Sequence, residues 1–217
     1  LLAEVAAGHP VLVLQNLAMD WYPRWHFAVV VGYDLSRQEL VLRSGDLPRR
    51  ITGFELFNTT WQRGHHWARV ILPPDTLPAT VQPQRWLQAS ADLEQTGPAP
   101  AALQAFRTAV QHWPEQPLAR FGLASRLLAS GDAAAARSEF EILLQQHPEM
   151  AAGWNNYAYA LRDAGCPAAA RAAIACAVTL EPANPAFAQS RDELASTASP
   201  LHNRPHCAIP TCPVNAP

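Results

Sequence analysis

A histidine stands at the start of an apolar run in the first third of the chain. His26 precedes residues 27–31, which read FAVVV, and residues 32–34, which read GYD, close the stretch. An imidazole titrates near neutral pH, so it can take a proton from a nucleophile and later return it to a leaving group. A histidine on an apolar strand can instead serve only the core. The residues that surround His26 must therefore decide between a catalytic and a structural role.

Several short apolar segments should position this histidine. We expect strands of an antiparallel sheet at residues 10–17, 25–34, 39–45 and 66–73, and a short helix at 53–61. The polar residues 34–38 indicate a hairpin between the second and third strands. Antiparallel pairing brings the start of one strand beside the end of its neighbour. Ser44 should then lie next to His26, with the carboxylate of Asp46 two residues further along the chain.

Composition and charge exclude some classes of protein. The chain has 217 residues, 49% of them hydrophobic, and a formal net charge of -2. All its basic residues are arginines, and they are scattered, so we do not expect a nucleic-acid partner. No apolar run approaches the roughly 18 residues that would span a bilayer. The chain opens on what reads as the end of a helix at residues 1–7, so we expect it to begin inside a domain.

The composition changes sharply along the chain. Residues 1–72 hold eight valines, whereas residues 83–198 hold two and are rich in alanine. The first part therefore favours strands and the second favours helices. Residues 72–83 contain four prolines, which indicate an irregular linker. We place a sheet domain at 1–73, the linker at 74–82, a helical domain at 83–195 and a disordered tail at 196–217.

The helical part is built from repeats of 34 residues. Pro114, Pro148 and Pro182 are separated by this interval, and four further sets of residues keep the same register. These sets are Gly97, Gly131 and Gly165; Ala102, Ala136 and Ala170; Phe106, Phe140 and Ile174; and Trp86, Arg120 and Trp154. The alanines allow the two helices of a repeat to approach closely, and the large residues fill the space beside them. We expect seven helices, which are three pairs and a capping helix.

This period and these residue types resemble the tetratricopeptide repeat. The resemblance implies an all-α solenoid whose first helices line a groove that binds a peptide or a protein partner. Its groove positions fall at Leu87, Ala91 and Glu94 in the first repeat, at Phe121, Ser125 and Leu128 in the second, and at Asn155, Tyr159 and Arg162 in the third. The repeats that grip a C-terminal carboxylate use lysines, which this chain lacks, so we expect an extended peptide with an apolar residue near Phe121 and a hydrogen-bonding or acidic group near Asn155 and Arg162. Alternatively, the groove holds only the linker or a neighbouring copy.

Residues 1–73 show a second resemblance. His26 with residues 27–33, the helix residues Phe54, Phe57 and Trp61, and the closing VILPP at 70–74 follow one another in a familiar order. This order is similar to the second half of the papain-like peptidases of the bacteriocin-leader, or double-glycine, type. It implies a partial papain-like antiparallel sheet, so the fold class expected for the whole chain is α+β.

That resemblance implies hydrolysis of a peptide bond by a Cys–His pair, with His26 as the base and no cofactor. The family's cysteine, and the glutamine before it, lie in a half-domain that this chain lacks, so the chain alone should be inactive. Ser44 stands where the family has the aspartate that orients the histidine, and Asp46 is the other candidate for that role. The resemblance favours the periplasm or cell envelope of a bacterium, although the cytoplasm also fits.

The cysteines and the histidines near the C-terminus give weaker evidence of a functional site. His202, His206, Cys207 and Cys212 are zinc-ligand types, but their spacing is poor, so we expect no metal site. Cys207 could pair with Cys212 in an oxidising compartment. Cys166 and Cys176, in the third repeat, are expected to be buried free thiols.

Two interpretations follow from the sequence. The first is a fragment of a bacterial cysteine peptidase that carries a tetratricopeptide module for binding proteins. The alternative is a non-catalytic, peptidase-like scaffold for protein–protein interaction. A cysteine or its substitute upstream of residue 1 would separate them.

Overall fold

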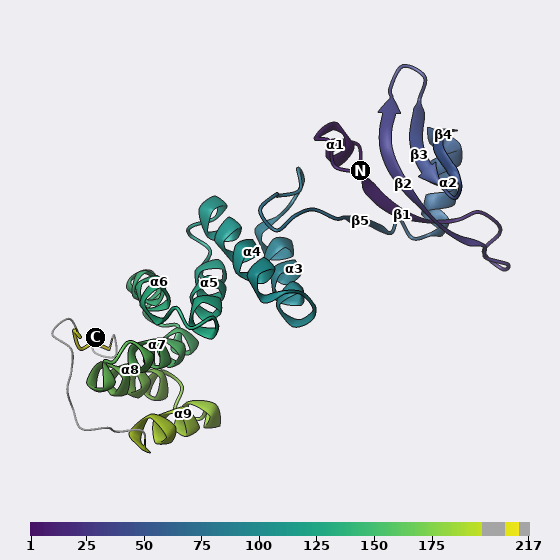
Figure 1. Ribbon diagram of the computed structural model, residues 1–217. Coiled ribbons are helices and arrows are strands. Elements are labelled where there is room, and N and C mark those ends of the chain that lie inside the picture. Colours follow the sequence, from purple (N-terminus) through teal and green to yellow (C-terminus); the bar gives the residue numbers. More distant parts are fainter. Residues whose placement is uncertain (197–206, 213–217) are drawn as a thin grey trace. The chain divides into compact units, whose positions relative to one another are not determined.

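The computed structural model describes residues 1–196 and 207–212. The chain divides into two compact units, Leu1–Gln82 and Pro83–Pro217. The first unit holds a small antiparallel sheet and the second a run of helices, as expected for an α+β chain (Figure 1). No helix within 1–196 or 207–212 has the length and apolar character needed to cross a membrane.

The first unit is built around a five-stranded sheet in the order β4-β3-β2-β1-β5. Its strands are β1 (Val11–Asn16), β2 (Trp25–Asp34), β3 (Glu39–Ser44), β4 (Leu47–Gly53) and β5 (Ala68–Val70), and its helices are α1 (Leu2–Ala6) and α2 (Phe54–Arg63). Neighbouring strands pair antiparallel, and the hairpin between β2 and β3 lies where the sequence predicts it. β5 is shorter than predicted, with only three paired residues.

Strand β4 is missing from the sequence-based prediction. It reads LPRRITG and is an edge strand that pairs only with β3. Six of its seven residues are exposed, and only Thr52 is half-buried. An exposed edge strand needs no alternation of apolar and polar residues, and Pro48 and the two arginines are typical of such edges. The pattern that revealed the other strands was therefore absent.

One face of the sheet packs against α2. Its core consists of aliphatic side chains and one aromatic ring, namely Val11, Val13, Ala28, Val30, Leu40, Leu42 and Phe57. The end of α2 approaches β1 so closely that a Cβ at Gly64 would lie 2.2 Å from the carbonyl oxygen of Leu14. Only glycine fits there, and this contact fixes how the last turns of α2 lie over β1.

A buried carboxylate ties the Pro-rich segment to the N-terminal helix. Glu4, in α1, is only 4% exposed. It accepts hydrogen bonds from the backbone N–H of Ala79 (2.9 Å) and Thr80 (2.8 Å), from the Thr80 hydroxyl (2.6 Å), and contacts His9 Nδ1 at 3.0 Å. Burial opposes ionisation, but these hydrogen bonds outweigh it and lower the pKa of Glu4 to about 2. Residues 79 and 80, which we predicted to be linker, are thus held by the first unit.

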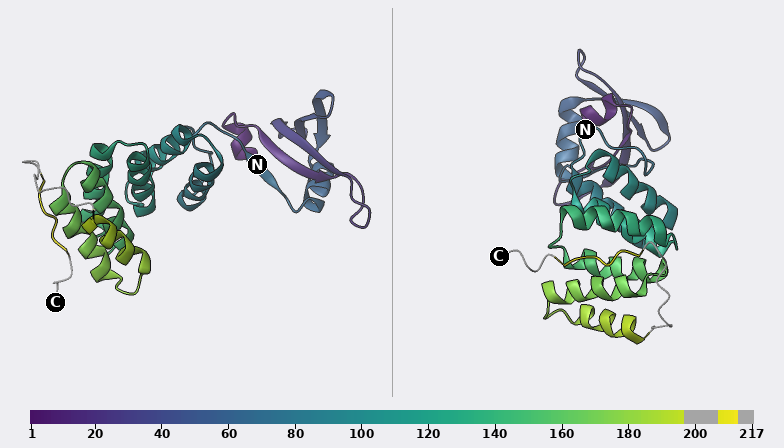
Figure 2. Two further views of the ribbon diagram at one scale, coloured as in Figure 1. Left: turned by 60° about the horizontal axis from the view of Figure 1, so that its bottom comes forward. Right: turned by 90° about the vertical axis from the view of Figure 1, so that its left-hand side faces the viewer.

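The second unit contains seven helices within the described residues. They are α3 (Pro83–Thr96), α4 (Ala99–His112), α5 (Pro117–Ala129), α6 (Ala133–Gln146), α7 (Ala151–Asp163), α8 (Pro167–Leu180) and α9 (Pro185–Ser196). Figure 2 shows consecutive helices lying side by side as antiparallel pairs. Three pairs and a final single helix match the arrangement predicted from the 34-residue period.

The repeated positions have equivalent environments. Ala102, Ala136 and Ala170 are at most 1% exposed, and Phe106, Phe140 and Ile174 at most 5%. Trp86 donates a hydrogen bond from Nε1 to the carbonyl of Ala105, and Trp154 donates one to that of Pro148. Each pair therefore buries the face that its pattern predicts.

Arginine occupies the tryptophan position in the second repeat. Arg120 is 9% exposed, and its guanidinium forms a hydrogen-bonded ion pair with Glu139 of α6. Trp86 reaches Ala105 of the second helix of its repeat through a hydrogen bond, whereas Arg120 reaches the equivalent residue, Glu139, through an ion pair.

The cysteines differ from the prediction. Cys166 is not a free thiol, because it forms a disulfide with Cys207, and Cys207 therefore does not pair with Cys212. Cys176 is free and buried, as predicted. No group of three or more metal-ligating side chains occurs in residues 1–196 and 207–212. His202, His206 and most of the predicted disordered tail lie outside the described residues, but residues 207–212 are held against the third repeat by the disulfide.

Candidate functional site

The sheet brings together two of the three residues predicted to form a catalytic site. His26 is the second residue of β2 and Ser44 is the last residue of β3, and the antiparallel register places these ends side by side. The Nε2 atom of His26 lies 2.7 Å from the Ser44 hydroxyl oxygen. His26 is half-buried and Ser44 is 8% exposed. Asp46, in the turn after β3, is exposed, and the His26 ring forms its hydrogen bond with Ser44 instead.

His26 and Ser44 belong to a row of polar side chains. Two further members of this row, Gln15 and Thr60, were not predicted from the sequence. Gln15 on β1 pairs directly with His26 and is 5% exposed. Its amide donates a 2.7 Å hydrogen bond to the hydroxyl of Thr60 on α2, which itself donates to the carbonyl of Phe57. The signal was present in the sequence, since Gln15 follows Val11 and Val13 at the inward positions of one strand.

A small cavity adjoins this polar row. It has a volume of about 160 Å³ and is lined by Gln15, Ser44, Arg50 and Thr60, together with apolar residues. No hydrogen bond joins the second ring nitrogen of His26, Nδ1, to any residue in the described part of the chain. The arrangement can orient an imidazole through Nε2 while Nδ1 stays available for a proton.

In the helical unit, the predicted groove residues lie on the first helices of the second and third repeats. Phe121 and Ser125 are on α5, and both are half-buried. The Phe121 ring packs edge-on against Phe140 of α6, with ring centroids 6.3 Å apart. Ser125 accepts a 3.1 Å hydrogen bond from the Asn156 amide of α7. These contacts join the exposed side of one repeat to its core and to the next repeat.

Asn155 carries an unsatisfied polar atom. Its amide nitrogen donates a 3.0 Å hydrogen bond to Asn156 Oδ1. Its own Oδ1 atom is shielded from solvent and lacks a hydrogen-bond partner within residues 1–196 and 207–212. Such atoms are rare in folded proteins, because an unpaired buried acceptor costs about 1–3 kcal/mol.

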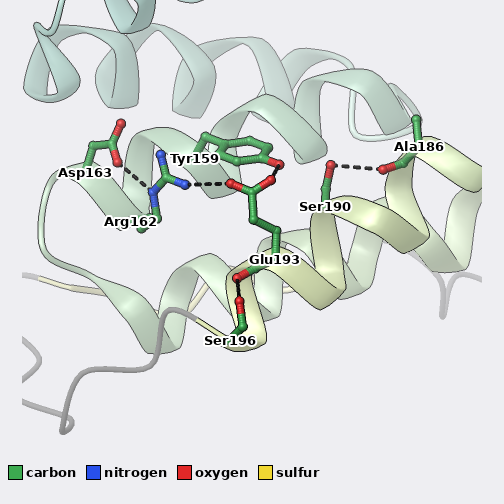
Figure 3. A network of polar contacts seen from close by, with 7 residues as sticks. All are labelled: Tyr159, Arg162, Asp163, Ala186, Ser190, Glu193 and Ser196. Carbon is green, nitrogen blue, oxygen red and sulfur yellow. Dashed lines mark hydrogen bonds and ion pairs between the residues drawn. The ribbon is translucent and has the colours of Figure 1, made fainter.

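Tyr159 and Arg162 meet the capping helix (Figure 3). The Tyr159 hydroxyl donates a 3.0 Å hydrogen bond to the Glu193 carboxylate of α9, which lies 34 residues further along the chain. The Arg162 guanidinium contacts the same carboxylate at 3.3 Å and Asp163 at 2.7 Å, and it lies 4.8 Å from the centre of the Tyr159 ring. Burial, together with the bond to Glu193, raises the pKa of the Tyr159 hydroxyl. The positive charge of Arg162 is therefore already shared between two carboxylates.

Comparison with known proteins shows what the helical unit is similar to. No protein-family profile and no curated protein matches the chain. Among solved structures, the first TPR domain of human RPAP3 matches with a TM-score of 0.50 and 13% identity over 52% of this chain and 90% of that one. The first TPR of Spaghetti (RPAP3), bound to the HSP90 peptide SRMEEVD, matches with a TM-score of 0.50 and 13% identity over 52% and 93%. A thermophilic TPR protein of Thermus thermophilus has 21% identity and a TM-score of 0.49, over 53% and 65%.

The first two matches establish the fold of the helical region. It has the tetratricopeptide repeat fold, in agreement with the 34-residue period and with the buried positions that keep it. The predicted resemblance of the sheet unit to a peptidase gains no support from these comparisons.

Proposed function

We propose that this chain binds an extended peptide segment of a partner protein along the first helices of its repeats. The observation that carries this proposal is the continuity of one face. Ser125 reaches Asn156 of the next repeat, and Tyr159 reaches Glu193 at the equivalent position of the capping helix. Side chains that contact the next repeat, as these do, form a single strip, which suits a ligand in extended conformation.

The chemistry of the strip indicates what the ligand offers. Phe121 and Leu128, both half-buried on α5, provide an apolar contact. Asn155 has an unpaired acceptor, and a peptide N–H can satisfy it after a small rotation of the side chain. The ligand is therefore an extended peptide with an apolar side chain over α5 and a backbone that hydrogen-bonds to the asparagines of α7.

A strongly acidic ligand fits this strip poorly. The SRMEEVD peptide of the Spaghetti complex carries two glutamates and a C-terminal aspartate. This chain has no lysine, and Arg162 is already engaged by Asp163 and Glu193. An acidic group would have to displace Glu193 before it reached that cation. The acidic alternative in the sequence-based expectation is thus less suited to the strip than the hydrogen-bonding one.

The test is selection of ligands from a random peptide library with the whole chain, followed by calorimetry. A selected peptide should bind with a micromolar Kd, about -8 kcal/mol. The double variant Asn155→Ala, Tyr159→Ala removes two hydrogen-bonding groups and should weaken binding by about tenfold or more. The SRMEEVD peptide should bind at least about tenfold more weakly than the selected one.

Gln145→Ala is the matched control, because Gln145 is exposed on the second helix of a repeat. It should leave the affinity unchanged, and the double variant should melt within a few degrees of the unaltered chain. Equal binding by the double variant would place the ligand elsewhere.

A second candidate function rests on the 2.7 Å contact between His26 and Ser44. We propose that Ser44 orients the imidazole as the base of a papain-like Cys–His site whose thiol comes from outside these residues. Such a base must accept a proton at Nδ1, so its neutral ring must carry the proton on Nε2 and donate it to Ser44.

Nitrogen chemical shifts of the neutral ring distinguish these tautomers. In alkaline solution, the His26 resonances should report a proton on Nε2, and Ser44→Ala should reduce this preference. His112, which is exposed on α4, is the control, and its tautomer should not respond to Ser44→Ala. A ring protonated mainly on Nδ1 would rule out this base.

A further inference from the structure

The segment 207–212 lies along the second helix of the third repeat. Cys207 is bonded to Cys166, which caps the start of α8, with the two Cα atoms 5.4 Å apart. At the other end of the segment, the thiol of Cys212 lies close enough to the thiol of Cys176 to influence its ionisation. Figure 2 shows the segment, in yellow, beside the helices of this repeat.

The spacing of the four cysteines fits this arrangement. Cys166 and Cys176 are ten residues apart on one helix, which corresponds to about 15 Å at 1.5 Å per residue. Cys207 and Cys212 are five residues apart, and an extended chain covers about 16 Å in that distance. Pro210 lies between them and favours extended backbone. The segment therefore runs parallel to α8, with a cysteine of each element meeting at both ends.

We propose that Cys176 and Cys212 form a second disulfide, so that the segment 207–212 becomes a strap fastened to α8 at both ends. One fastening, Cys166–Cys207, is present, and the thiols of the second pair are free and lie near each other. The strap lies on α8, whereas the proposed peptide-binding residues lie on α5 and α7. The proposed strap therefore does not depend on the peptide-binding proposal.

The two thiols differ in how readily they react when the second disulfide forms. Burial and the contact with Cys212 raise the pKa of Cys176 to about 12, so this thiol rarely ionises by itself. Cys176 is 3% exposed, whereas Cys212 is half-buried. Cys212 is consequently the thiol that an external reagent reaches first.

The oxidant is a disulfide, either of a small thiol or of a thiol-oxidising protein. The Cys212 thiolate attacks one sulfur of that disulfide, forms a mixed disulfide and releases the other sulfur as a thiol. The Cys176 sulfur then attacks the Cys212 sulfur, and its proton leaves with the second thiol of the oxidant. Two protein thiols are oxidised and one external disulfide is reduced to two thiols. Such bonds persist in an oxidising compartment.

Trypsin can test the pairing, because Arg171 separates Cys166 from Cys176 in the sequence. Cleavage after Arg162, Arg171 and Arg191 yields the peptides 163–171, 172–191 and 192–217, since the Arg204–Pro205 bond resists trypsin. The whole chain is incubated with oxidised glutathione, alkylated, unfolded and digested without reductant. We expect the three peptides to travel as one disulfide-linked species in mass spectrometry, without alkylated cysteine.

Two variants assign the individual bonds. In Cys207→Ser the peptide 192–217 should remain linked only to 172–191, and in Cys212→Ser only to 163–171. Alkylated Cys176 and Cys212 in the oxidised chain would overturn the strap, as would a bond between Cys207 and Cys212. Because each variant retains one fastening, loss of folding in one leaves the other to decide.

Discussion

Acidification from about pH 5 to about pH 2 should cost the sheet unit about 3 kcal/mol of stability through Glu4 alone. The pKa of this carboxyl is about 2 in the folded chain, compared with an ordinary value of 4.5. The difference of roughly 2.5 pKa units corresponds to about 3 kcal/mol. The carboxylate is buried and bonded to Ala79 and Thr80, so solvent screens this interaction little.

The sign follows from linkage. A group whose pKa is lowered by folding stabilises the folded chain fully above its unfolded pKa, and this stabilisation disappears as the pH falls through the folded pKa. Glu4 should therefore contribute its full stabilisation above about pH 5 and none below about pH 2. Protonation also weakens the acceptors that hold residues 79 and 80, so this segment should loosen in the same window.

Glu4→Gln isolates the effect. The variant should be less stable at neutral pH, and its loss of stability between about pH 5 and about pH 2 should be smaller by about 3 kcal/mol. Amide hydrogen exchange of β1 and β2, measured in the whole chain, reports the stability of the sheet unit separately from that of the helices. Glu55→Gln is the control, since Glu55 is exposed on α2, and it should keep the pH dependence of the unaltered chain. Identical pH profiles of Glu4→Gln and the unaltered chain would refute the assignment.

The parts of the fold that were predictable share one property, which is repetition or alternation of buried side chains. The 34-residue register located the three helix pairs because the same face is buried in each repeat, and Phe140 and Ile174 show it at fully buried positions. Val11 and Val13 of β1, and Ala28 and Val30 of β2, are buried at alternate positions, and the hairpin after β2 placed His26 and Ser44 at the same end of the sheet. Local pattern was sufficient in these cases.

What escaped prediction depends on contacts between distant residues. The bond from Gln15 to Thr60 joins residues 45 apart, and Cys166 pairs with Cys207 over 41 residues. No local sequence pattern predicts either contact. The exposed strand β4 escaped for a different reason, because it buries almost nothing. The engagement of Arg162 by Glu193 likewise required α9 to be placed beside α7, and it changes which ligand the strip suits.

Phe140→Ala should destabilise the helical unit by about 4 kcal/mol, which is the usual cost of removing a fully buried phenylalanine. Phe140 has no exposed surface. Its ring contacts Phe121 of its own repeat and Tyr157 of the next, with centroids 6.3 and 6.4 Å away. A cavity here would therefore weaken the junction between two repeats as well as the packing within one.

Two control variants, a conservative replacement of Phe140 and a substitution at an exposed position of the same helix, make this prediction specific. Phe140→Ile should cost roughly half as much or less, because isoleucine occupies the equivalent position 174 in the next repeat and leaves a smaller cavity. Gln145→Ala, on the exposed side of α6, should change stability by less than about 0.5 kcal/mol. The measurement is urea denaturation followed by helical circular dichroism. Because the Phe121 ring packs against Phe140, Phe140→Ala should also weaken binding of the selected peptide. Phe140→Ile should retain most of the affinity for this peptide. Equal losses of stability in the alanine and isoleucine variants would mean that the cavity is not the cause.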